Sequence, residues 1–164
     1  MAIIISDDDV RQHLTMAECI EAMRVAFSDY AEGKAITLPR VRYRSTTSDP
    51  ERQYLANVHV GAVPSYGMAC VRAGSNCLLQ DSAIPGRKIH SNPEPVNWTV
   101  IILYDLATAE PVAFLHESYL SGLRVGATTG AAVDAIARDD VKELGLFGTG
   151  RQARASATAI CTVR

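Results

Sequence analysis

The stretch LGLFGTGRQA at residues 144–153 decides the fold, because it joins an apolar run to a glycine-rich turn and a helix-forming segment. The apolar run predicts a buried strand at residues 143–147. In the G-x-G-x-x-A turn, Gly148 permits a tight bend, Gly150 lets the backbone approach a pyrophosphate, and Ala153 allows close packing of helix on strand. The N-terminus of the helix offers N–H groups to phosphates. This strand–turn–helix context favours a dinucleotide site over an ordinary turn.

The dinucleotide fingerprint also requires a second strand and an acidic residue roughly 20 residues further on, which holds a ribose hydroxyl. The sequence stops at Arg164, before either feature. We therefore expect residues 141–164 to be only the opening of a dinucleotide-binding domain, with one strand and one helix.

The residues before this turn predict a mixed α/β fold with an antiparallel-rich sheet. Residues 118–138 are expected to form the longest helix, with small residues along one side that let a neighbouring helix approach closely. Thr15-Met-Ala-Glu18 has the pattern of a capping box at the start of another helix, which Gly33 would close. Alternating or continuous apolar patterns predict strands at residues 3–5, 40–45, 53–63, 68–74, 98–104 and 111–115, with a long loop at residues 80–97.

Composition narrows the classes of partner. The 164 residues are 48% hydrophobic and 21% charged with a net charge of −2, which is typical of a globular domain and offers no basic field for nucleic acid or a membrane surface. No apolar stretch approaches the ~18 residues of a membrane span, and the run at residues 1–5 is too short for a secretory signal. We expect a cytoplasmic location. His59 and His90 lie too far apart in the sequence to predict a metal site.

Arginines are the candidate ligand-binding residues. Arg124 lies among small residues of the predicted long helix, so it is either a surface side chain or one that reaches a carboxylate or phosphate with its planar fork. Arg40, Arg42 and Arg44 share one strand face by the period of two, which is either a solvated face or a carboxylate-binding wall. Arg72 lies inside an apolar strand, where it must be paired within the fold or face a ligand.

Three segments together resemble the ornithine cyclodeaminase/μ-crystallin family. They are TVIILYD followed by TAEPVAFL at residues 99–115, LSGLRVGATTGAA at residues 120–132, and LGLFGTGRQAR at residues 144–154. The resemblance implies an NAD- or NADP-dependent protein that acts on small amino or imino acids. It also implies a fold in which an antiparallel-rich substrate domain with flanking helices is followed by the first βα unit of a truncated Rossmann domain. Residues 1–140 would then form a substrate-binding and dimerisation domain with a connecting helix, and the protein would be a homodimer.

The resemblance also suggests roles for particular residues. Arg124 would contact the substrate carboxylate near the nicotinamide, and Arg40, with Arg42 as the alternative, would be a second carboxylate contact. Arg151 and Gln152, which follow the second glycine of the turn, would meet the cofactor phosphates. The catalytic aspartate of the family lies beyond the last residue, so no catalytic residue is assigned.

One departure from the family pattern concerns the substrate. Family members commonly carry a lysine on the third strand, where this sequence has Arg72. An arginine keeps the charge but cannot transfer a proton, because its guanidinium stays protonated in proteins. Arg72 therefore remains a candidate substrate contact, and ornithine cyclodeamination is disfavoured. Three hypotheses follow: an amino-acid or imino-acid oxidoreductase, a ligand-binding protein of the μ-crystallin kind with little turnover, or an inactive truncated form.

Overall fold

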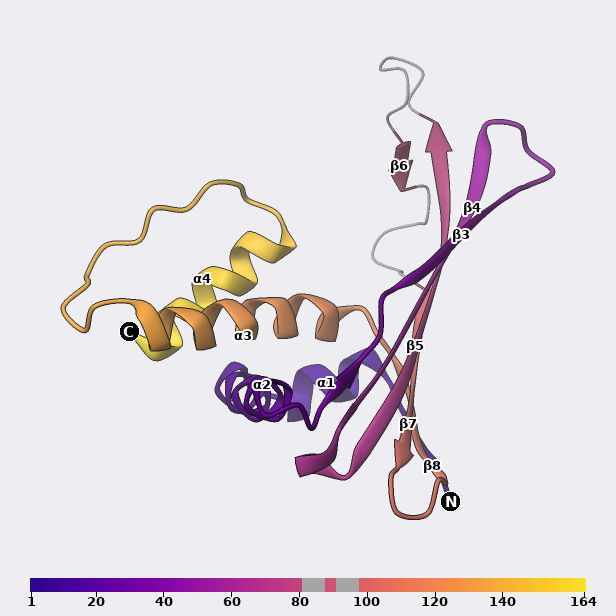
Figure 1. Ribbon diagram of the computed structural model, residues 1–164. Helices are drawn as coiled ribbons and strands as arrows, with labels where there is room; N and C mark the ends of the chain where they lie inside the picture. Colours follow the sequence, from indigo (N-terminus) through magenta and orange to yellow (C-terminus); the bar gives the residue numbers. More distant parts are fainter. Residues whose placement is uncertain (81–87, 91–97) are drawn as a thin grey trace. The chain divides into compact units, whose positions relative to one another are not determined.

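The computed structural model describes residues 1–80, 88–90 and 98–164, so most of the loop expected at residues 80–97 lies outside the described residues. The secondary-structure elements follow one another along the chain as β1 (Ile3–Ile5), α1 (Asp7–His13), α2 (Met16–Ala31), β2 (Ile36–Thr37), β3 (Val41–Thr46), β4 (Arg52–Val63), η1 (Pro64–Tyr66), β5 (Met68–Gln80), β6 (Lys88–His90), β7 (Trp98–Asp105), β8 (Pro111–His116), α3 (Tyr119–Ile136) and α4 (Arg151–Val163). Figure 1 shows these elements coloured along the sequence.

The chain divides into two compact units. Residues 1–6 and 35–118 form the first, here called the sheet unit, and residues 7–34 and 119–164 form the second, the helical unit. The mixed α/β fold expected from the sequence is confirmed. The domain boundary expected at residue 140 stays a prediction.

The described strands of the sheet unit form one mixed sheet. Its order is β1-β8-β7-β5-β4-β2, with β3 also paired to β4 and β6 to β5. All neighbours run antiparallel except β1, which lies parallel to β8. The strands expected at residues 98–104 and 111–115 are confirmed and pair antiparallel with each other. The strand expected at residues 68–74 extends to Gln80, because β4 pairs with it from Met68 to Leu79 and β6 pairs with Gln80.

The register gives the sheet two chemically different faces. Directly paired residues share a face, since side chains alternate along each strand. One face, here called the apolar face, carries Val41, Tyr43, Trp98, Val100 and Phe114, all of them exposed. The opposite face, the polar face, carries the arginines of β3 and β5 together with buried residues of the neighbouring strands.

The helical unit begins with the predicted capping box. The Thr15 hydroxyl accepts a hydrogen bond from the Glu18 N–H, and the Glu18 carboxylate accepts one from the Thr15 N–H at 2.9 Å. Gly33 follows α2 with φ of +72°, a left-handed conformation that glycine adopts at low cost. Both helix-end predictions are therefore confirmed.

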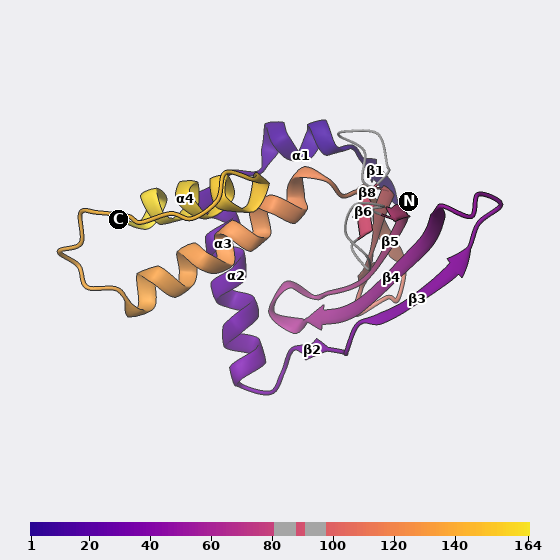
Figure 2. The ribbon, with the colours of Figure 1, turned by 90° about the horizontal axis from the view of Figure 1, so that it is seen from above.

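Helices α3 and α4 lie alongside each other in both Figure 1 and Figure 2. They touch through the small residues expected on one side of α3. A Cβ atom added at Gly126 would lie 2.4 Å from the Ala155 carbonyl oxygen, and one at Gly130 would lie 3.0 Å from the Ala159 Cβ. The two backbones can approach this closely only because glycine has no side chain.

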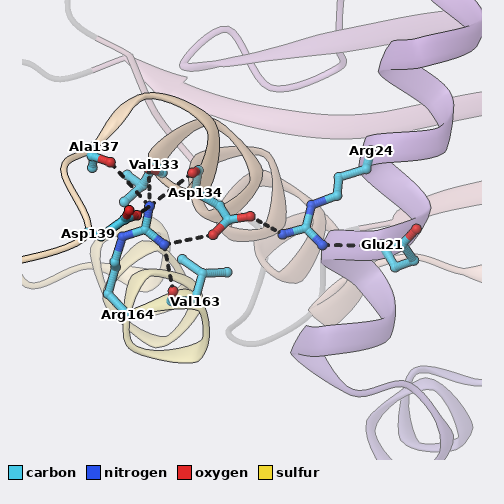
Figure 3. A network of polar contacts seen from close by, with 8 residues as sticks. All are labelled: Glu21, Arg24, Val133, Asp134, Ala137, Asp139, Val163 and Arg164. Atoms are coloured by element: carbon cyan, nitrogen blue, oxygen red, sulfur yellow. Dashed lines mark hydrogen bonds and ion pairs between the residues drawn. The ribbon is translucent and has the colours of Figure 1, made fainter.

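A polar network joins the three longer helices of the helical unit (Figure 3). Asp134 of α3 accepts hydrogen bonds from Arg24 of α2 and from Arg164 at the end of α4. Arg164 also donates to the carbonyl oxygens of Val133, Asp134 and Ala137. Val133 and Asp134 lie in the last turn of α3 and Ala137 directly follows it, so Arg164 acts as a C-terminal cap supplied from another helix.

The strand predicted at residues 143–147 is wrong. This segment is an extended connection between α3 and α4 with no ladder partner among the described residues, and the Phe147 side chain is fully exposed. The apolar pattern is that of a buried parallel strand. A single extended segment leaves its backbone N–H and C=O groups unpaired, so it becomes a strand only where neighbouring strands flank it.

Candidate functional site

The glycine-rich turn has the backbone geometry that the sequence predicts. Gly148 has φ of +100°, and Gly150 is the N-cap of α4 in an extended conformation. No side chain caps this helix end, and its first internal hydrogen bond runs from the Arg154 N–H to the Gly150 oxygen. The preceding N–H groups of the first turn are thus oriented for an outside acceptor, as in an anion-binding helix terminus.

The space around the turn is open. A Cβ atom added at Gly148 or Gly150 would meet no atom within 4 Å. Arg151 and Gln152 follow as the first two residues of α4, and both are exposed. The residues present therefore fit a phosphate group, which would approach the bare backbone with a cation beside it.

Arg151 also lies against the first turns of α3. The carbon stem of its side chain passes 3.2 Å from the position that a Cβ of Gly122 would occupy. Arg124 lies two residues further along α3, and its side chain is exposed. The structure therefore brings Arg151 to the stretch of α3 that carries Arg124, with a glycine providing the room.

The charge of Arg124 acts on a neighbouring helix. Burial raises the pKa of the Cys19 thiol of α2, and the positive charge of Arg124 opposes that rise. Cys19 belongs to the buried core of the helical unit, together with Ile20, Leu123 and Ala127. Arg124 is therefore placed at the margin of an apolar core, where its charge is less screened than in bulk water.

Arg72 is held inside the sheet unit by Glu117. Its Nε atom donates a hydrogen bond to the carboxylate oxygen Oε2 at 2.7 Å, and its Nη2 atom forms an ion pair with the same oxygen at 2.6 Å. The Glu117 side chain is completely buried, and that of Arg72 is 18% exposed. Of the two interpretations open at the sequence level, pairing within the fold is observed, and contact with a ligand is untested.

The other arginines of the polar face have weaker partners. Arg42 donates from Nε to the Asn57 amide oxygen at 2.6 Å, and Arg44 donates to Gln53 at 3.3 Å. Arg40 is exposed and precedes β3, which starts at Val41. The guanidinium of Arg40 makes no hydrogen bond or ion pair within the described part of the chain, so it is available to a ligand.

The predicted site residues thus fall into two groups. Arg40 and Arg72 belong to the sheet unit, whereas Arg124, Arg151 and the glycine turn belong to the helical unit. Their assignment to one site stays a prediction. Sequence reasoning missed Glu117, although an acidic residue directly after the apolar run of β8 indicates a buried charge that needs a cationic partner.

No group of three or more His, Cys, Asp or Glu side chains is placed to hold a metal ion in residues 1–80, 88–90 and 98–164. Within the same residues, no helix has both the length and the apolar character needed to cross a membrane.

Similar proteins extend over the whole chain but continue well beyond its length. Delta(1)-pyrroline-2-carboxylate reductase of Bacillus cereus is 28% identical over 162 residues, which are 99% of this chain and 46% of the reductase. Alanine dehydrogenase of Archaeoglobus fulgidus is 29% identical over 154 residues, or 92% of this chain and 42% of the enzyme. The chain thus spans about half the length of the curated relatives it matches.

A solved structure and a family profile agree with these relatives. The reductase of Thermococcus litoralis, solved in complex with NADH and L-proline, superposes with a TM-score of 0.73 at 27% identity and covers 98% of this chain and 46% of that one. The profile of the ornithine cyclodeaminase/mu-crystallin family matches residues 2–164. Since this match covers all but the first residue, and since the fold agrees, the protein belongs to the ornithine cyclodeaminase/mu-crystallin family.

Proposed function

We propose that the protein binds NAD or NADP at the turn of residues 148–152 and takes part in the oxidoreduction of a small amino or imino acid. The observation that carries the proposal is the uncapped N-terminus of α4 behind a glycine with φ of +100°. The reductase and dehydrogenase relatives support the reaction class, and the NADH and L-proline of the Thermococcus litoralis structure support the ligands.

Different residues of this chain would bind the cofactor and the substrate. Backbone N–H groups of the turn, with Arg151 and Gln152, would hold the cofactor phosphates, and Arg124 of the same unit would offer its planar fork to the substrate carboxylate. Arg40 stays a second candidate contact for a carboxylate. A bound nicotinamide would supply or accept a hydride at the α-carbon of the substrate. Arg72 cannot transfer protons, so it serves as a fixed donor beside the substrate.

Titration of NADH with the protein, followed by nicotinamide fluorescence, tests the cofactor site. We expect emission to increase with the wild type and to stay unchanged with Gly150→Val, whose side chain would fill the space in front of the turn. Gly145→Ala is the matched control, because a Cβ there also meets no atom within 4 Å but lies before the turn. Binding by Gly150→Val at the wild-type affinity, or no binding by the wild type, would contradict the proposal.

A second candidate function is ligand binding with little turnover. It is favoured by Arg72, which occupies the lysine position of the family and cannot itself transfer a proton. A panel of L-proline, L-alanine and L-ornithine with the oxidised cofactor separates the two functions. NADH formation with any of them supports the oxidoreductase, whereas saturable binding of the amino acid without NADH formation supports the second candidate.

We also propose that the protein is a homodimer in which a second copy covers the apolar face. Val41, Tyr43 and Trp98 are 63%, 55% and 60% exposed there, and contiguous exposed apolar surface of this kind is typical of an interface. An archaeal alanine dehydrogenase of similar fold, with a TM-score of 0.76 and 24% identity over 99% of this chain, was solved as a dimer. Dependence on a cellular dinucleotide also supports the cytoplasmic location expected from the sequence.

Sedimentation velocity tests the dimer. Val41→Lys should convert a dimer to a monomer, because it places a charge on the apolar face. Arg44→Lys is the control, because Arg44 follows Tyr43 on β3 and lies on the opposite, polar face. This variant should keep the mass of the wild type. A monomeric wild type would refute this part of the proposal.

A further inference from the structure

Glu117 is placed with little freedom to move. It follows β8 directly, its backbone N–H donates to the Thr99 oxygen at 2.8 Å, and its side chain is fully buried. Thr99 is itself buried, with 1% exposure. A carboxylate fixed in this way is a built feature of the sheet unit, because moving it would require rearrangement of the strands.

Arg72 presents only part of its guanidinium to Glu117. The Nε atom donates a hydrogen bond to Oε2 and the Nη2 atom forms an ion pair with it, whereas Nη1 makes no hydrogen bond or ion pair with any residue that the structure describes. The strand of Arg72 is central, with β4 and β7 on its two sides, and the residues paired with Arg72 are His59 and Ile101. The side chain is thus held at one edge while 18% of its surface stays accessible.

We propose that Glu117 is a positioning residue that orients Arg72 and offsets its charge, so that Arg72 offers hydrogen bonds to a substrate without attracting a second carboxylate. An uncompensated guanidinium at the margin of a protein interior binds any carboxylate that reaches it. A carboxylate already within 2.7 Å supplies that attraction internally and repels a further anion. The repulsion between the Glu117 carboxylate and a second carboxylate of the ligand then makes the site specific for ligands with one carboxylate.

This inference rests on the proposed function and makes it narrower. The substrate carboxylate would be held away from Arg72, and the part of the substrate that meets Arg72 would carry no negative charge. Amino and imino acids with one carboxylate fit this description, and dicarboxylates do not. The arrangement also accounts for an arginine whose side chain is only 18% exposed, since its charge has a partner before any ligand binds.

The test compares the affinities of succinate and acetate for the whole 164-residue chain and three variants, by titration calorimetry. In Glu117→Gln, which keeps the shape but removes the charge, we expect the affinity for succinate relative to acetate to rise by about tenfold or more. Glu117→Asp keeps the charge and should keep the wild-type ratio. The double variant Arg72→Gln with Glu117→Gln also removes the guanidinium that would bind the second carboxylate of succinate. Its succinate-to-acetate affinity ratio should therefore return to the wild-type value.

If Glu117 only stabilised the fold, Glu117→Gln would change the affinities for succinate and acetate by the same factor, and their ratio would stay at the wild-type value. An unchanged ratio in Glu117→Gln, or a gain that persists in the double variant, would overturn the proposal. A second measurement uses the wild type alone. The Arg72 Nε–H resonance, assigned through its bonds to the Arg72 backbone, should not shift as succinate is added, and a saturable shift would also overturn the proposal.

The outcomes separate this inference from the proposed function. If the wild type binds no amino acid or cofactor but Glu117→Gln gains succinate binding through Arg72, the proposed function fails and the role of Glu117 stands. If the wild type binds cofactor and L-proline but the succinate ratio does not change in Glu117→Gln, the proposed function stands and the role of Glu117 fails.

Discussion

The sheet unit and the helical unit place groups close together by different means. In the sheet unit, Arg72 and Glu117 come within 2.7 Å because their opposite charges compensate each other in a buried place. In the helical unit, α3 and α4 approach closely because Gly122, Gly126 and Gly130 have no side chains. The first contact should therefore be sensitive to the removal of a group and the second to the addition of one. Four substitutions, each of which removes or adds one group, test how the two units respond in stability.

The largest loss is expected from Glu117→Leu in the sheet unit. Removal of one partner of a buried ion pair leaves an uncompensated charge and typically costs about 3–5 kcal/mol. Urea denaturation followed by circular dichroism measures the change in the free energy of unfolding. Arg72→Met combined with Glu117→Leu should recover most of the loss, because an apolar pair replaces the ionic one. A double variant as unstable as the single one would show that packing, and not charge, is the cause.

A smaller but still large loss is expected from Gly126→Ala in the helical unit. The added methyl group would lie 2.4 Å from the Ala155 carbonyl oxygen, so α4 must shift, and overpacking of this kind costs about 1–3 kcal/mol. The same change at Gly145, where a Cβ meets no atom within 4 Å, is the control. Hydrogen exchange should show the loss of protection first in α3 and α4. Equal stability of Gly126→Ala and Gly145→Ala would contradict the close helix contact.

Thr15→Ala should cost about 1 kcal/mol, since it removes the side-chain acceptor of an N-cap. Thr128→Ala is the matched change within the same unit, because the Thr128 hydroxyl only donates back to the Arg124 carbonyl of its own helix. That substitution should leave the thermal midpoint nearly unchanged. The cap interpretation fails if both variants lose the same stability.

The smallest effect is expected from Asp134→Asn, and it depends on pH. The side-chain hydrogen bond from Arg164 is the main cause that lowers the pKa of Asp134 below its ordinary value of 3.8. A carboxyl group with a lowered pKa in the folded state contributes stability above its ordinary pKa, and this contribution is lost as the pH falls through the lowered value. The thermal midpoints of wild type and variant should differ at neutral pH and converge in acid. A difference that persists below the lowered pKa would refute the ionic role.

Two apolar segments show how much of the fold the sequence can predict. Residues 98–104 and residues 143–147 both have the pattern of a buried strand. The first lies between β5 and β8 and is a strand, and the second has no strand beside it among the described residues and is an exposed connection. Local pattern predicts the tendency to form a strand, whereas the presence of a partner is a property of the tertiary fold.

The candidate site was predictable to a similar degree. The geometry at Gly148 and Gly150 follows from the motif itself, because the turn is local. The pairing of Arg72 with Glu117 joins residues 45 positions apart, and no local pattern indicates which acidic residue meets which arginine. The charge in an apolar strand showed that a partner was needed. Only the sheet register, which brings β5 and the end of β8 within reach across β7, identifies that partner.

Trp98 gives the apolar face a built-in optical reporter. It is the single tryptophan of the chain, it is 60% exposed, and its indole ring lies 5.9 Å from the His116 ring on the same face. Any molecule that covers this face removes water from the indole and shifts its emission to shorter wavelength. Intrinsic fluorescence at increasing protein concentration therefore follows assembly on this side of the sheet without a label.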